Sequence, residues 1–269
     1  MLVVHVLIVW GLVVLALAVA FFFERRHKKG GEKPEYAVAL GFVSSSYGVL
    51  LGLLVAFGSN HYNDVRHQAQ QEADTLVALW DTVAVYPVEL RNPARHDILC
   101  YMRAIRDYDW PSMKRGERTG SRPGLLWGDQ LRRTIHQLPA TGGNGRSSAY
   151  GRAQSQMTDA GTSRQQLLFF AESEVPTVLW VVIYAGAFLL FLLIAMHYAG
   201  RPAGRLVSLG AVVALLTVVV SVLSILDKPY GGGARINPTS LRHAIDLVNP
   251  HRQKTGEVYA LCPRTPPQT

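Results

Sequence analysis

The sequence predicts an all-α integral membrane protein with four transmembrane helices that extend into a helical extramembrane domain. Only 17% of the residues are charged, whereas a soluble domain carries about 25%. The charged residues are also unevenly spread, because residues 2–23, 36–59, 175–197 and 206–226 contain almost none. Each stretch has about 20 or more residues, enough for a helix to cross roughly 30 Å of hydrocarbon. This pattern excludes an ordinary soluble protein, a disordered chain and a transmembrane barrel.

The spans divide the chain into four parts. Residues 1–59 hold the first two spans and a basic loop, residues 60–174 form a helical extramembrane domain, residues 175–226 hold the last two spans, and residues 227–269 form a tail with one short helix. The second span is expected to continue as a helix to about Val85, where Pro87 ends it. Asn92 is expected to cap a second helix, and Trp127 to Leu138 predict a third by their spacing. Residues 140–163 are rich in Gly, Ser, Thr and Gln, which predicts a flexible loop with a helix that forms gradually towards Phe170.

Basic residues predict the orientation in the membrane. A cluster lies between the first two spans, and Arg201 and Arg205 lie between the last two. Because cytoplasmic loops carry excess Lys and Arg, we expect the N-terminus and the large loop to lie outside the inner membrane of a bacterium. The net charge is +8, but charges in residues 60–174 are nearly balanced, so we expect the lipid bilayer and not nucleic acid as the partner. The cluster comprises Arg25, Arg26, Lys28, Lys29 and Lys33.

The two cysteines, Cys100 and Cys262, both fall outside the membrane in this orientation. A disulfide is therefore permitted, although two unpaired thiols are the favoured interpretation. The chain has no C-x-x-C pair and no metal-ligand spacing. It also lacks the sequence patterns of common hydrolases, metalloproteases and nucleotide-binding enzymes. We therefore expect no enzymatic activity, no catalytic residue, no metal site and no cofactor.

The second span carries small and hydroxyl residues along one face. Gly41, Ser45, Gly48 and Gly52 fall at offsets 0, 4, 7 and 11, which align at 3.6 residues per turn. One interpretation is close helix packing, which small residues allow in lipid. The other is a stripe that lines a narrow pore. No acidic or basic residue lies inside any span, which disfavours a pump or coupled transporter but suits a passive channel.

The end of the second span resembles the corresponding helix of bestrophins. In that family an apolar helix runs into a Phe-Arg-x-Asn motif, followed by an aromatic residue and an Arg. Phe57, Asn60, Tyr62 and Arg66 match this pattern loosely, and Gly58 stands where the family has its first Arg. After the fourth span, the turn of Asp227, Pro229, Tyr230 and Gly231 resembles an Asp-Pro-Phe-Gly turn of the same family.

The overall arrangement is most similar to the bestrophin-like family of bacterial membrane proteins. Its members have four spans in this two-plus-two layout and an acidic-Trp-Pro motif, here Asp109, Trp110 and Pro111. They also have a Pro before a Leu-Trp at the third span, here Pro176. The Glu72-Ala73 pair in the long helix fits as well.

The resemblance implies an oligomeric anion channel, a pentamer in bestrophins, with chloride or another small anion as the partner. Carried over, Ser45, Gly48 and Gly52 would face the pore and Phe57 would narrow it. In bestrophins the large domain is cytosolic, whereas the charge bias places it outside here, and we follow the charge bias. The alternative is a non-conducting scaffold or sensor whose extramembrane domain binds a partner or ligand.

Overall fold

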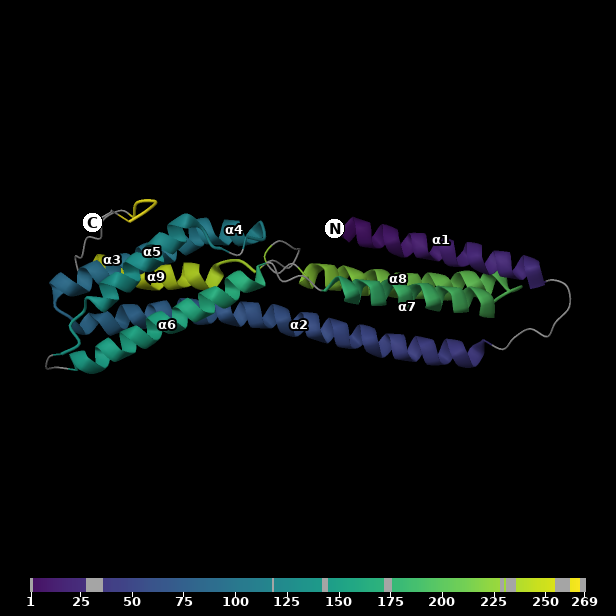
Figure 1. The fold of residues 1–269 in the computed structure, drawn as a ribbon, viewed down its shortest axis with the longest axis horizontal. Helices are drawn as coiled ribbons and strands as arrows, with labels where there is room; N and C mark the ends of the chain where they lie inside the picture. The colour runs from purple at the N-terminus through teal and green to yellow at the C-terminus, as the bar shows by residue number, and fades with distance from the viewer. Residues whose placement is uncertain are drawn as a thin grey trace. The chain divides into compact units, whose positions relative to one another are not determined.

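The computed structural model describes residues 2–27, 36–117, 119–141, 145–171, 176–227, 230, 236–254 and 262–266. Within these residues the chain is almost entirely helical and contains no β-strand (Figure 1). The all-helical prediction is confirmed. Four of the helices are long and apolar enough to cross a membrane, as predicted.

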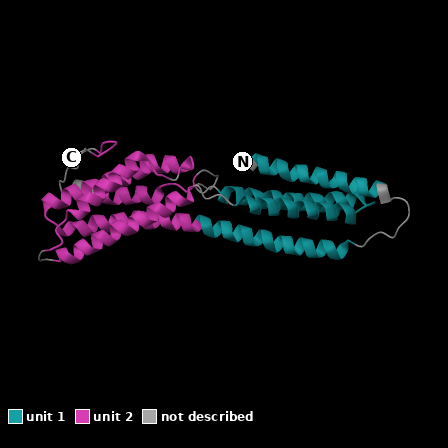
Figure 2. Ribbon diagram, viewed as in Figure 1, with its two compact units in different colours: residues 1–62, 174–228, 232–234 teal, residues 63–173, 229–231, 235–269 magenta. Residues whose placement is uncertain are grey.

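The chain forms two compact units (Figure 2). The first, here called the membrane unit, comprises Met1–Tyr62, Glu174–Lys228 and Gly232–Ala234. The second, here called the extramembrane unit, comprises Asn63–Ser173, Pro229–Gly231 and Arg235–Thr269.

Three helices of the membrane unit pack together around an apolar core. They are α1 (Leu2–His27), α7 (Thr177–His197) and α8 (Pro202–Leu226). Val9 of α1, Phe191 of α7 and Leu216 of α8 belong to one buried cluster. Glu24 of α1 pairs with Arg205, near the start of α8, at 3.1 Å. Both residues lie next to the uncharged stretches 2–23 and 206–226, Glu24 in the last turn of α1 and Arg205 in the first turn of α8.

The fourth spanning helix, α2 (Ala37–Thr82), is attached to this bundle through a narrow face. The Tyr47 hydroxyl donates to the Ile183 carbonyl at 2.7 Å. The same ring lies against Gly186, where a Cβ atom would come within 2.5 Å of it. Only 11% of the apolar spanning stretch of α2 is buried, against 22–33% in the other three spans. Most of its surface is therefore available to lipid or to another molecule.

The 46 residues of α2 make a helix of roughly 69 Å, more than twice the thickness of the hydrocarbon. The helix must therefore leave the membrane, and its part beyond residue 62 belongs to the extramembrane unit. A short 3-10 turn, η1 (Val83–Val85), follows it, and Tyr86 is extended before Pro87. The predicted continuation of the second span to Val85 is confirmed.

The extramembrane unit is a helical layer around a buried aromatic and aliphatic core. Trp80 of α2, Trp127 and Leu131 are almost fully buried in it. Its further elements are α3 (Val88–Ala104), the π-helical turn η2 (Ile105–Asp109), α4 (Trp110–Lys114), α5 (Arg122–His136), α6 (Arg146–Phe170) and α9 (Thr239–Lys254).

Two local predictions are wrong. Helix α3 starts one turn before the predicted cap, so that Pro87 is its N-cap and Asn92 lies inside it with Pro93. Residues 146–163 do not belong to a flexible loop, because the helix expected toward Phe170 already begins at Arg146. Residues 142–144 lie outside the described residues. The buried face of α6 is built largely from small side chains, so the sequence shows only a weak apolar periodicity there. Its buried apolar members are Ala149, Ala153, Met157, Ala160 and Leu167.

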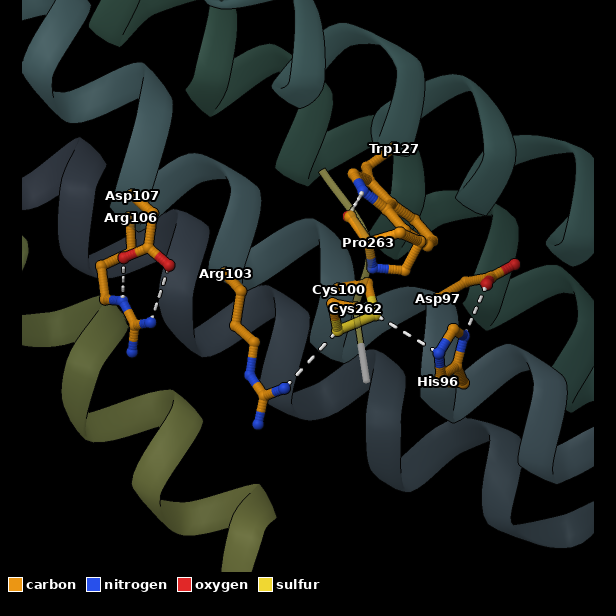
Figure 3. The surroundings of a disulfide bond; sticks show 9 residues. All are labelled: His96, Asp97, Cys100, Arg103, Arg106, Asp107, Trp127, Cys262 and Pro263. Atoms are coloured by element: carbon orange, nitrogen blue, oxygen red, sulfur yellow. Dashed lines mark hydrogen bonds and ion pairs between the residues drawn. A yellow bond between two sulfur atoms is a disulfide. The ribbon is translucent and has the colours of Figure 1, made fainter. Parts of the chain in front are cut away.

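The prediction of two unpaired thiols is also wrong, because Cys100 and Cys262 form a disulfide (Figure 3). Their Cα atoms are 5.3 Å apart, within the range that disulfides require. The bond joins α3 to a segment near the C-terminus. The Trp127 indole nitrogen also donates to the Pro263 carbonyl at 3.2 Å, so a hydrogen bond holds the same segment beside α5.

Candidate functional site

The Gly/Ser face, defined as Gly41, Ser45, Gly48 and Gly52, lies on α2 and is exposed along its length. A Cβ atom built on any of its three glycines would meet no atom within 4 Å among the described residues. The glycines are therefore not required for packing inside the chain, in contrast to Gly186 beneath the Tyr47 ring. Among the described residues, nothing of the chain itself packs against this stripe, so the face is open to lipid or to another molecule.

The hydroxyl of the Gly/Ser face is bonded to its own helix. Ser45 Oγ donates to the Phe42 carbonyl at 3.0 Å, and the neighbouring Ser44 Oγ donates to the Gly41 carbonyl at 3.1 Å. A serine oxygen keeps lone pairs in this state, and the hydroxyl can also rotate to donate. The face is thus polar at Ser45 and carries no charged side chain.

Phe57 is also exposed, at 65% of its surface, but it lies on another side of α2. It follows Gly48 by nine residues, which at 3.6 residues per turn is a rotation of about 180°. A pore lined by the Gly/Ser face would therefore not be narrowed by Phe57. The family resemblance placed Phe57 with the Gly/Ser face, whereas the helical period puts it on another side of α2.

The similar stripe on α8 is satisfied by its own backbone. The hydroxyls of Thr217, Ser221 and Ser224 each donate to the carbonyl four residues earlier, at 2.6–2.8 Å. Gly210 is open in the same way as the glycines of α2, with no described atom within 4 Å of an added Cβ. The α8 stripe therefore resembles the Gly/Ser face in its small residues and in hydroxyls that donate to their own helix.

A second candidate site, here called the Arg164 cluster, comprises Glu72, Asp109 and Arg164 and is buried in the extramembrane unit. One Arg164 Nη donates to Asp109 Oδ2, and the other lies 3.8 Å from Glu72 Oε2. Glu72 Oε1 has no hydrogen-bond partner among the described residues. The three side chains come from α2, η2 and α6, so the cluster joins three separate elements.

Asp109 also fixes the start of α5. The backbone N–H of Ser121 donates to Asp109 Oδ1 at 2.8 Å, and the Ser121 hydroxyl donates to the same oxygen. Ser121 in turn accepts from the Gly124 N–H at 3.1 Å, which makes it the N-cap of α5. Gly124 must be glycine here, because a Cβ would lie 2.3 Å from Asp109 Oδ1.

Two of the motifs that were distant in sequence meet beside this cluster. The rings of Trp110 and Tyr230 pack edge to face with centroids 5.4 Å apart. The Tyr230 hydroxyl donates to the Leu167 carbonyl at 3.0 Å, one turn after Arg164 on α6. Pro111 is exposed in the first turn of α4.

The other motif residues do not join this site. Asn60 and Arg66 are exposed on α2, and Tyr62 between them is half-buried. Asp227 is half-buried at the end of α8. Pro229 and Gly231 lie outside the described residues.

Burial raises the pKa of Glu72 to about 7; Arg164 acts in the opposite direction, and Asp109 adds to the increase. Burial also opposes the charge on Arg164, yet Glu72 and Asp109 hold the pKa of Arg164 above its ordinary value. One guanidinium faces two carboxylates, so the cluster is neutral when Glu72 holds a proton. Tyr101 and Tyr230 stay protonated beside it, because burial raises the pKa of both.

The comparisons with known proteins show the family and the fold of the chain. The family model described as a bestrophin-like domain matches residues 6–241, which is most of the chain. The chain belongs to the bestrophin-like family. The resemblance inferred from the motifs is thereby confirmed.

The fold of this bestrophin-like chain is also that of solved structures. A bacterial bestrophin homologue from Klebsiella pneumoniae, in one single-substitution variant, matches with a TM-score of 0.69 and 13% identity, covering 95% of this chain and 99% of that chain. A second variant matches with a TM-score of 0.68 and 11% identity over the same shares. A third structure of that homologue gives 0.66 and 12%, covering 96% and 100%. No curated protein matches the chain.

Sequence reasoning missed Arg164, Ser121 and Gly124 of this bestrophin-like chain. Arg164 lies on the buried face of α6, whose other members are small or apolar. A basic residue in such a place indicates a buried acidic partner, but only once that face is known. Ser121 precedes Pro123 and Gly124 as a helix start does, a capping signal that was available in the sequence. Asp109 and Trp110 were identified as motif residues, but their partners could not be.

The Arg164 cluster makes the stability of the extramembrane unit depend on pH. Glu72 has an ordinary pKa of 4.5 and a folded pKa of about 7. Between these values the folded chain keeps a proton that the unfolded chain has lost, so stability falls as pH rises through this window. We expect Glu72→Gln to remove this decrease in stability. The melting temperature of the variant minus that of the unmodified protein should therefore be larger at pH 8 than at pH 5. The exposed Glu89→Gln is the control, and parallel pH profiles for Glu72→Gln and the unmodified protein would contradict the assignment.

Proposed function

We propose that the chain is one subunit of an oligomeric, passive ion channel and that the Gly/Ser face of α2 lines its pore. The observation that carries the proposal is that this face is open, because its glycines support no packing among the described residues. Membership of the bestrophin-like family supports a protein of channel type.

The proposed pore requires an oligomer. One α2 helix offers a single narrow polar face, and a pore needs a ring of such faces around an axis. The glycines would allow the helices to come close, or leave space for ions, without a side chain in the way. By resemblance to bestrophins we take five copies as the working number.

We propose chloride as the first ion to test. The apolar stretches of the spans carry no acidic or basic residue, so selectivity would rest on hydroxyls, helix dipoles and pore width. The resemblance to bestrophins favours an anion over a cation. The absence of a charged relay fits passive flow down a gradient.

We place the extramembrane unit on the outer side of the bacterial inner membrane. The basic residues between the spans favour this orientation, and the disulfide supports it, since disulfides persist in oxidising compartments. A membrane-impermeant reductant added to spheroplasts should therefore break the Cys100–Cys262 bond. A bond that resists this reagent but yields to a permeant reductant would place the unit in the cytosol.

Flux from liposomes tests the channel directly. The purified full-length protein should release chloride from liposomes at a rate that rises with protein content, and potassium release under the same gradient measures selectivity. If potassium is released faster than chloride, the channel proposal stands but the proposed preference for anions is wrong. A well-assembled oligomer that releases neither ion would contradict the channel.

The alternative is a non-conducting sensor whose extramembrane unit responds to a ligand or to pH. The observation that favours it is the buried Glu72 with its pKa of about 7, a value at which a proton exchanges near neutral pH. A sensor of this kind would change the protection of α2 and α6 from hydrogen exchange between pH 6 and pH 8, without ion flux.

A further inference from the structure

We propose that His96, Cys100 and Cys262 form a site for a thiophilic divalent cation of the zinc class when the disulfide is reduced. The ligand atoms of these three residues all lie within 4.8 Å of one another. The proposal does not depend on ion conduction, because every residue involved lies in the extramembrane unit.

The spacing on α3 fits zinc geometry. His96 and Cys100 are one helical turn apart, and the Cys100 Sγ to His96 Nε2 distance is 3.5 Å (Figure 3). Tetrahedral zinc with its usual bond lengths to sulfur and nitrogen places those two ligands about 3.5 Å apart. This pair is therefore already positioned for a metal, whichever state the sulfurs are in.

The other nitrogen of His96 has the support that metal-binding histidines usually have. His96 Nδ1 lies 3.2 Å from Asp97 Oδ1, and Asp97 Oδ2 accepts from Thr134 Oγ1 at 2.6 Å. A carboxylate that holds one ring nitrogen of a histidine fixes the tautomer and directs the other nitrogen toward the metal. Figure 3 shows the His96 ring between Asp97 and the disulfide.

Cys262 would stay close to the site after reduction, because other contacts hold its segment. Trp127 Nε1 donates to the Pro263 carbonyl at 3.2 Å, and the Arg264 guanidinium lies over the Tyr108 ring at 5.6 Å. In a zinc site the two sulfurs would lie about 3.8 Å apart. Cys262 lies outside the helices, so its side chain can move away from Cys100 by this amount without disturbing α3.

The charges in the site also balance. Arg103 Nη1 lies 3.5 Å from Cys262 Sγ, where a cation favours the thiolate. A divalent ion with two thiolates is formally neutral, so Arg103 does not oppose the complex. Sequence alone showed no metal-ligand spacing, because the two cysteines are 162 residues apart and only the fold brings them together.

The chemical steps are a reduction followed by metal binding. A dithiol reductant supplies two electrons and two protons, which break the Sγ–Sγ bond and leave two thiols, and the reductant becomes a disulfide. The divalent ion then binds both sulfurs and His96, and two protons leave the thiols.

The test is a titration of the full-length protein in detergent with Co²⁺ and Zn²⁺, after purification without a histidine tag. We expect one ion per reduced chain, with the thiolate-to-cobalt absorption of a two-sulfur site, and none for the oxidised chain. Cys100→Ser should abolish this absorption. His96→Gln should weaken metal binding by at least about tenfold. Losing a residue that only supports a ligand already costs about that much, and His96 is itself a proposed ligand. The exposed His243→Gln is the matched control and should bind normally.

Three results would overturn the proposal. The first is no binding by a reduced chain that keeps its helical content. The second is equal binding by the oxidised chain or by His96→Gln. The third applies if reduction alone lowers the helical content: the proposal then requires Zn²⁺ to restore that content, and helical content that stays low after Zn²⁺ is added would overturn it.

Discussion

Arg164→Met is expected to destabilise the extramembrane unit by about 3–5 kcal/mol, the cost of removing one partner from a buried ion pair. Arg164 is 5% exposed and is the only cation of the buried cluster that holds Asp109 and Glu72. Its loss would leave Asp109 without its charged partner, and Asp109 also fixes the start of α5 through Ser121. Thermal unfolding followed by circular dichroism in detergent measures the effect, and we expect a midpoint lower by about 10 °C or more.

Arg132→Met is the matched control for this experiment. Arg132 pairs with Asp129 at 3.4 Å on the exposed side of α5, where ion pairs contribute little. Its midpoint should stay that of the unmodified protein. Glu72→Gln added to Arg164→Met should recover part of the lost stability, because it removes one unpaired carboxylate. Equal midpoints for Arg164→Met and Arg132→Met would contradict the role given to the cluster.

Gly48→Leu is expected to abolish ion flux. Gly48 lies at the centre of the Gly/Ser face, and a leucine there would fill the space that the proposed pore leaves for ions. The substitution itself causes no clash with described atoms of its own chain, since nothing lies within 4 Å of an added Cβ. Chloride release from liposomes measures the change.

Gly11→Leu is the control for Gly48→Leu. Gly11 lies in α1, another spanning helix, and is equally open among the described residues. The size of each purified oligomer should be measured together with its flux. Loss of flux in Gly48→Leu but not in Gly11→Leu, with both oligomers intact, supports the proposed pore. Undiminished flux in Gly48→Leu would remove the Gly/Ser face from the pore.

The spanning helices could be predicted from the sequence because their signal is local. A run of about 20 apolar residues needs no knowledge of the rest of the chain. The stop at Pro87 is local as well, since proline cannot continue a helix beyond the preceding turn. The helix that leads to Phe170 was expected, but its start at Arg146 was missed, because alanines such as Ala149 and Ala153 carry its buried face and its serines, glycines and glutamines resemble a loop.

The parts of the sites that depend on distant contacts could not be predicted. Cys100 and Cys262 meet only because the C-terminal segment lies against α3. The Arg164 cluster likewise needs α2, η2 and α6 to be packed before its charges can be paired. The periodicity of Gly41, Ser45, Gly48 and Gly52 was sufficient to identify one face, whereas Phe57 was assigned to it from family resemblance and not from the helical period.

The most direct test of the pore compares Ser45→Cys with Phe57→Cys in the liposome assay. Both positions are exposed on α2 but lie on different sides of it, and the two native cysteines form a disulfide that does not react with thiol reagents. A charged methanethiosulfonate added from outside should block flux through Ser45→Cys and leave Phe57→Cys unaffected. Block of Phe57→Cys, or flux through Ser45→Cys that persists after the modification is verified by mass spectrometry, would contradict the assignment of the Gly/Ser face to the pore.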